Sequence, residues 1–163
     1  MVEHGEEGHV LTTVSMAGLL PGVGTYGVSK HAVMALTEAL SRDLITRQTK
    51  INASVLCPGF VDTNIDKSER NRPSHLGDAR ETTNEIGAEI MSAMLRQGKK
   101  PDEIAEIVLE AIKKNIFYIL SHPAWDDSLR SHFDNILSRK EILPNSEEEM
   151  AKFFSPREDG EKY

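Results

Sequence analysis

The sequence has a single cysteine, Cys57, among 163 residues, which excludes a disulfide within the chain and favours a reducing compartment. It also lacks a long apolar run, because no stretch approaches the roughly 20 residues that a helix needs to cross a bilayer. Its first ten residues, MVEHGEEGHV, are acidic and have neither the basic start nor the apolar centre of a signal peptide. We therefore expect a soluble, cytoplasmic protein with no membrane partner.

Basic clusters are absent as well. Lysine and arginine number 19 against 26 acidic residues, which gives a net charge of −7, and no basic group exceeds the pairs Lys99-Lys100 and Lys113-Lys114. A nucleic-acid partner is therefore not expected. The six histidines form no metal-ligand spacing with cysteine or acidic residues, so we assign them solvated or capping roles and predict no metal site.

The chain does have the length and composition of one globular domain. HVLTTVS, rich in β-branched residues, predicts a strand over 9–15, and INASVLC predicts a second over 51–57, where Cys57 would be a packing residue. Between them, residues 25–49 have helical periodicity. The stripe expected to face the core consists of Val33, Leu36, Leu40 and Leu44.

After the second strand, a polar stretch over 62–83 has no clear periodicity. Ile86, Ile90 and Met94 then mark a helix that ends at Gly98, and Pro101-Asp102-Glu103 is a typical start for another. IFYIL predicts a third strand over 116–120, followed by a short helix near 129–137. This alternation predicts an α/β fold with a parallel sheet, whose ligands bind at the carboxyl ends of the strands.

Ser15 and Pro58-Gly59 lie at two such strand ends, and Tyr26 and Lys30 follow the first of them. Spaced four apart, Tyr26 and Lys30 share one face of a helix. A lysine ammonium stabilises the phenolate form of a nearby tyrosine, as a general acid/base requires, and a serine can hold an oxygen that gains charge. The alternative is that the two residues are only packing neighbours on a solvated helix.

The combination of motifs is more specific than the pair. SMAGLLPG, then YGVSKHAVMALTEAL and then VLCPGFVDT resemble the C-terminal half of a classical short-chain dehydrogenase/reductase, with the 32-residue separation of Tyr26 and Pro58 typical of that family. PDEIAEIVLEAIKKNIFYILSHP resembles the family's last long helix and strand. The similarity covers about residues 8–122. The resemblance implies the C-terminal half of a Rossmann-type doubly wound sheet, with about three neighbouring parallel strands and flanking helices.

It also implies roles for individual residues in the interconversion of an alcohol and a carbonyl with NAD or NADP. Tyr26 would be the acid/base. Lys30 would stabilise the phenolate and bond the nicotinamide ribose, and Ser15 would orient the substrate oxygen. Pro58 and Gly59 would bring backbone close to the nicotinamide ring. The Val61 N–H and the Thr63 hydroxyl would hold the carboxamide.

The sequence departs from the family pattern in three places. Ser15 and Tyr26 are 11 residues apart, about two fewer than is common, and Thr12 stands where asparagine is usual. No glycine-rich strand-to-helix turn precedes Ser15. We therefore expect a C-terminal piece of the family fold. The alternative to an oxidoreductase is a truncated, non-catalytic fragment that keeps the fold and a helix interface but cannot hold cofactor.

By the same resemblance, residues 1–140 form a partial catalytic domain, with a substrate lid over about 64–98. Residues 141–163 are acidic, and we expect them to form a mobile tail. Ile86, Ile90, Met91 and Met94 of the lid either line an apolar substrate site or pack on the core. The expected partner is a small alcohol or carbonyl compound. The family commonly dimerises through the helix that carries Tyr26 and Lys30, so a homo-oligomer is expected of the full-length family form.

Overall fold

The computed structural model describes residues 1–21, 24–77 and 85–141. Its helices and strands follow the order β1 (Gly8–Thr13), α1 (Gly24–Thr46), β2 (Ile51–Leu56), α2 (Glu85–Gln97), α3 (Pro101–Lys113), β3 (Tyr118–Ile119) and α4 (Asp126–Leu137), with short 3-10 turns between them. The chain divides into two compact units. The first consists of residues 1–59 and 110–163, and the second of residues 60–109.

The sheet lies in the first unit. β1 pairs with β2 in parallel, from Gly8 opposite Ile51 to Thr13 opposite Leu56, and β2 pairs in parallel with β3, so the order is β1-β2-β3. The predicted layer of three neighbouring parallel strands is therefore confirmed. β3 is shorter than the predicted 116–120, and Phe117 and Leu120 on either side of its two paired residues pack against the core.

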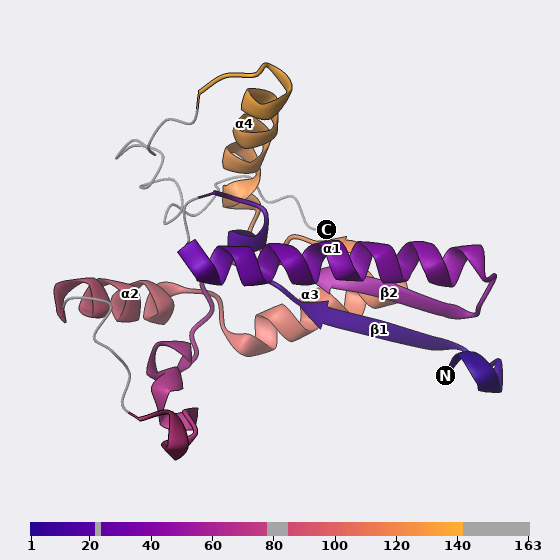
Figure 1. Ribbon diagram of the computed structural model, residues 1–163, viewed down its shortest axis with the longest axis horizontal. Helices are drawn as coiled ribbons and strands as arrows, with labels where there is room; N and C mark the ends of the chain where they lie inside the picture. The colour runs from indigo at the N-terminus through magenta and orange to yellow at the C-terminus, as the bar shows by residue number, and fades with distance from the viewer. Residues whose placement is uncertain (22–23, 78–84, 142–163) are drawn as a thin grey trace. The chain divides into compact units, whose positions relative to one another are not determined.

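The helix α1 runs alongside β1 and β2 (Figure 1) and covers one face of the sheet. Met34 from α1 packs with Val14, Met16, Val55 and Cys57 in one buried cluster. A second cluster, nearer the other end of the helix, joins Leu44 to Ile51 and Ala53 of β2, with Leu40 and Val10 against it.

The prediction that Leu36 of α1 faces the core is wrong. The side chain of Leu36 is 70% exposed, whereas Thr37 is buried. At 100° per residue, Thr37 lies on the helix face between the buried Met34 and Leu44, whereas Leu36 lies on the opposite side of Val33 from that face. Thr37 remains satisfied there because its hydroxyl donates to the Val33 carbonyl at 2.8 Å.

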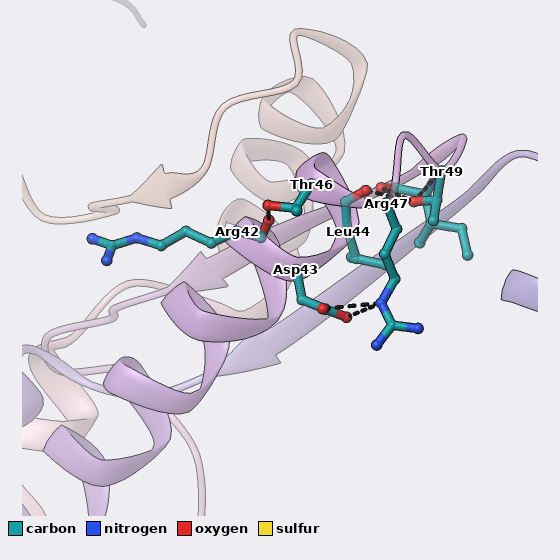
Figure 2. A network of polar contacts seen from close by, with 7 residues as sticks. Arg42, Asp43, Leu44, Thr46, Arg47 and Thr49 are labelled. Atoms are coloured by element: carbon teal, nitrogen blue, oxygen red, sulfur yellow. Dashed lines mark hydrogen bonds and ion pairs between the residues drawn. The ribbon is translucent and has the colours of Figure 1, made fainter.

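The connection from α1 to β2 is closed by backbone and side-chain hydrogen bonds (Figure 2). Gln48 takes a left-handed conformation with φ 52°, and its N–H donates to the Ile45 carbonyl. The Thr49 N–H donates to the Leu44 carbonyl. This is the Schellman pattern that satisfies the last carbonyls of a helix. An ion pair between Arg47 and Asp43 at 2.8 Å, about half exposed, adds little stability.

α2 ends at Gln97, just before Gly98, and α3 begins at Pro101, as the sequence predicted. Gly98 follows α2 closely, and a side chain there would collide with the Phe60 backbone. Pro101 opens α3, and the carboxylate of Glu103 accepts the backbone N–H of Lys100 at 2.7 Å, one half of a capping box. None of the helices among the described residues is both long and apolar enough to span a membrane. The predicted tail falls, except for residue 141, outside the described residues.

Candidate active site

Ser15 lies just past the carboxyl end of β1. Its hydroxyl accepts the Ala17 N–H at 3.2 Å and so caps the short 3-10 turn Met16–Gly18. The same hydroxyl donates a long hydrogen bond, 3.4 Å, to the Pro58 carbonyl at the end of β2. Because the side chain is only partly buried and this bond is long, the hydroxyl can exchange it for a better acceptor.

Tyr26 and Lys30 lie in the first two turns of α1. The Nζ of Lys30 is 5.6 Å from the centre of the Tyr26 ring, within the range of a cation–π contact. The same Nζ donates to the Thr13 carbonyl at 3.4 Å, at the last residue of β1. Lys30 therefore connects the tyrosine to the strand that leads to Ser15. The Tyr26 side chain is 42% exposed, so a substrate or cofactor can reach it.

Gly18 fixes the distance between the serine loop and α1. A Cβ on this residue would lie 2.6 Å from the Val14 side chain and 3.0 Å from the Lys30 backbone, so only glycine fits. Its carbonyl accepts a hydrogen bond from Nδ1 of His31 at 2.9 Å, so His31 carries its proton on Nδ1. The loop and the helix turn that holds Lys30 are thus in direct contact.

The peptide group between Pro58 and Gly59 is held from both sides. Its carbonyl accepts the Met16 N–H at 2.9 Å, and its N–H donates to Nδ1 of His122 at 3.0 Å. A Cβ on Gly59 would lie 3.0 Å from the His122 ring and 3.2 Å from the Trp125 ring. The two rings therefore explain why residue 59 is a glycine, which the sequence alone did not reveal.

The remaining two predicted cofactor residues lie in the second unit. Val61 forms an isolated parallel bridge with Lys99, and Thr63 is exposed. Between them, Asp62 forms an ion pair of 2.5 Å with Lys100, and this hydrogen bond and charge raise the pKa of Lys100. The structure thus brings Ser15, Tyr26, Lys30 and the Pro58-Gly59 peptide into one unit and assigns Val61 and Thr63 to the other.

Other polar residues singled out from the sequence have structural explanations. Cys57 is fully buried, and burial raises the pKa of its thiol to about 12, so the thiol stays protonated and inert. His9 donates from Nε2 to the Ser54 hydroxyl at 2.9 Å, because that hydroxyl already donates to the Ile116 carbonyl at 2.6 Å. Because the Ser54 hydroxyl does not donate to His9, this histidine is not placed to activate Ser54 as a nucleophile.

In the predicted lid, the apolar residues of α2 divide between two environments. Leu95 is buried, whereas Ile90 and Met91 are 50% and 45% exposed. The side chain of Ile86 is outside the described residues. A polar chain from Arg96 through Ser92 to Asp66, with distances of 2.9 and 2.8 Å, connects α2 to the 3-10 turn Ile65–Asn71.

Comparison with known proteins shows which family this sequence resembles. Residues 1–74 match the family model of short chain dehydrogenases. A CLA biosynthesis dehydrogenase/reductase of Lactiplantibacillus plantarum is 31% identical over 145 residues, which cover 85% of this chain and 51% of that protein. A 1-deoxy-11-beta-hydroxypentalenate dehydrogenase of Streptomyces exfoliatus is 31% identical over 151 residues, covering 91% and 48%. The chain thus spans about half the length of these relatives.

A solved structure extends the likeness to three dimensions. A short chain dehydrogenase/reductase from Burkholderia phymatum, in complex with NAD, is 36% identical and superposes with a TM-score of 0.82 over 90% of this chain and 54% of that one. The parallel sheet β1-β2-β3 with its flanking helices agrees with this likeness. The chain belongs to the short-chain dehydrogenase family.

Proposed function

We propose that the chain carries the acid/base side of an oxidoreductase site in which an alcohol and a carbonyl compound are interconverted with NAD or NADP. The observation that carries the proposal is the position of Lys30, whose ammonium contacts both the Tyr26 ring and the end of β1 two residues before Ser15. Three residue types needed for proton transfer to an oxygen are thus held by one strand end and one helix.

In this proposal Tyr26 gives a proton to the carbonyl oxygen of the substrate, or takes one from the alcohol. Its exposure leaves the hydroxyl accessible. The charge of Lys30 stabilises the phenolate that remains after the proton has left. Ser15 holds the same substrate oxygen, exchanging its long bond to the Pro58 carbonyl for a bond to that oxygen.

The donors present fit the nicotinamide side of a dinucleotide, which supplies the hydride in this chemistry. An ammonium has three donors, and the contact with Thr13 uses one, so Lys30 can also bond a ribose hydroxyl. The Burkholderia phymatum relative binds NAD. Val61 and Thr63 are proposed to hold the carboxamide through the Val61 N–H and the Thr63 hydroxyl.

We further propose that residues 1–140 act as the catalytic part of the chain, with residues 64–98 as the lid that selects the substrate. The exposed Ile90 and Met91 of α2 favour a substrate with apolar parts. The buried, protonated thiol of Cys57 is compatible with the reducing cytoplasm, where we place the protein.

A second proposal concerns the surface of α1. Five exposed apolar residues form a stripe along this helix: Val28, Ala32, Ala35, Leu36 and Ala39. Val28 and Leu36 are 72% and 70% exposed, and the alanines between them allow a close approach of backbones. We propose a second copy of the chain as the partner of this stripe. The non-catalytic alternative, a chain that keeps only the fold and this interface, predicts the stripe equally well.

Turnover separates the two functions. Reduced nicotinamide is followed by its absorbance with a panel of secondary alcohols and ketones. The assay uses the 163-residue chain and a chimaera in which the chain replaces the matching half of the Burkholderia phymatum protein. We expect substrate-dependent turnover in the chimaera. A folded chimaera that binds NADH and turns over no alcohol or ketone would favour the non-catalytic alternative.

A further inference from the structure

The peptide group between Pro58 and Gly59 has two hydrogen-bonding ends that face different parts of the first unit. Its carbonyl accepts the Met16 N–H at 2.9 Å and the Ser15 hydroxyl at 3.4 Å. Its N–H donates to Nδ1 of His122 at 3.0 Å. Because a peptide group is a rigid plane, an acceptor on the N–H side sets the direction of the carbonyl on the other side.

His122 is that acceptor. Nδ1 accepts the Gly59 N–H, so the neutral ring must carry its proton on Nε2. The Ser121 hydroxyl lies 3.0 Å from the same nitrogen and can only donate to it. Ser121 has no solvent exposure, so its hydroxyl holds the ring from inside the protein.

Packing fixes the ring against the glycine. The space that a side chain on Gly59 would need is occupied by the rings of His122 and Trp125, at 3.0 and 3.2 Å from the position of a Cβ. Packing therefore holds the His122 ring against Gly59, and a side chain at residue 59 would displace this ring or the Trp125 ring.

We infer that His122 is a positioning residue of the site: it orients the Pro58-Gly59 peptide and, through the bond between the Pro58 carbonyl and the Met16 N–H, positions the turn that begins at Ser15. The connection runs from Ser121 through His122 and the peptide to Met16 and Ser15, and so joins the ends of all three strands. The part that concerns catalysis rests on the proposed function, because it requires Ser15 to hold the substrate oxygen.

Three variants of His122 test whether its role depends on the position of a hydrogen-bond acceptor or on the size of its ring. His122→Asn keeps an acceptor oxygen at the δ position. His122→Gln moves the acceptor one atom further out, and His122→Leu removes it. We therefore expect the asparagine variant to resemble the wild type and the other two to resemble each other.

Amide hydrogen exchange of the 163-residue chain tests these hydrogen bonds without an activity assay. In His122→Leu and His122→Gln we expect exchange at Gly59 and at Met16 to rise by about five- to tenfold, the equivalent of one hydrogen bond. The asparagine variant should return both to the wild-type rate. The Val14 N–H, which donates to the Leu56 carbonyl at 2.8 Å, is the control amide and should not change. A nitrogen NMR spectrum of the wild type should show the proton on Nε2 of His122.

The inference is overturned if Nδ1 carries the proton, or if Gly59 or Met16 exchanges at the wild-type rate in His122→Leu. It is also overturned if Val14 changes as much as Met16, since the effect is then general loosening. Turnover of the chimaera tests the catalytic part: kcat should fall in His122→Leu and return in His122→Asn. Unchanged kcat in His122→Leu would overturn that part. An inactive wild type would instead count against the proposed function, with the exchange rates still deciding the role of His122.

Discussion

The ammonium of Lys30 lies 5.6 Å from the centre of the Tyr26 ring and donates to the carbonyl of Thr13 at the end of β1. One side chain thus ties the proposed acid/base to the strand that positions Ser15. Its charge and its hydrogen bonds have separable consequences.

Lys30→Met should therefore affect two observables in an active chimaera. Loss of the ribose bond weakens NADH binding, and loss of the positive charge moves the alkaline limb of the pH–rate profile to higher pH. Lys30→Arg keeps the charge and should leave the limb nearly in place. Weaker binding with an unmoved limb in Lys30→Met would leave lysine only its role toward the ribose.

The α1 stripe predicts self-association. Leu36→Glu places a charge in the centre of the stripe, where burial against a second copy would be costly, so the variant should be a smaller species by light scattering. Ile45→Glu is the matched control, because Ile45 is equally exposed, at 72%, but lies outside the stripe. An assembly that resists Leu36→Glu would rule out this surface as the interface.

The left-handed end of α1 predicts a stabilising substitution. Gln48 has φ 52°, a conformation that costs most residues free energy and costs glycine little. Gln48→Gly should raise the free energy of unfolding by about 0.5–1 kcal/mol, measured in urea. Asn115 has the same φ at the end of α3, but asparagine tolerates it better, so Asn115→Gly should gain less. Equal gains would show that the conformation is not the cause.

These helix ends illustrate how much the sequence could reveal. The end of α3 near Asn115 was predictable, because asparagine is a common left-handed residue, whereas glutamine at 48 carries no such signal. The strands were predictable from their β-branched runs and the order of the sheet from the family resemblance. Leu36 was misassigned because hydrophobicity alone does not distinguish a core stripe from an apolar surface stripe.

His122 was missed for a different reason. It forms its hydrogen bond with Gly59, 63 residues away, and local patterns contain no information on such a contact. The only signal was its place, two residues after the third predicted strand, at the same edge of the sheet as Ser15 and Pro58. The residues Ser15, Tyr26 and Lys30 were found because their spacing along the chain is itself a family pattern.

Cys57 predicts a pH dependence of stability. Burial raises the pKa of its thiol from 9.0 to about 12. Between these values the unfolded chain loses a proton that the folded chain keeps, so the contribution is complete below pH 9 and the free energy of unfolding falls as pH rises toward 12. Cys57→Ala should lack this part of the decline, as measured by urea unfolding from pH 8 to about 10.5. Parallel pH curves for the two proteins would contradict the assignment.

Removing one hydroxyl tests the central claim most directly, with a second tyrosine as control. Tyr26→Phe keeps the ring and its contact with Lys30 but removes the proton donor. Tyr118→Phe removes a hydroxyl that bonds only to Glu38 in the described contacts, at 2.8 Å. In the active chimaera, kcat of Tyr26→Phe should fall by roughly 10²–10⁴-fold with NADH binding little changed, while Tyr118→Phe stays near the wild type. Near-normal turnover in Tyr26→Phe would show that Tyr26 is not the acid/base.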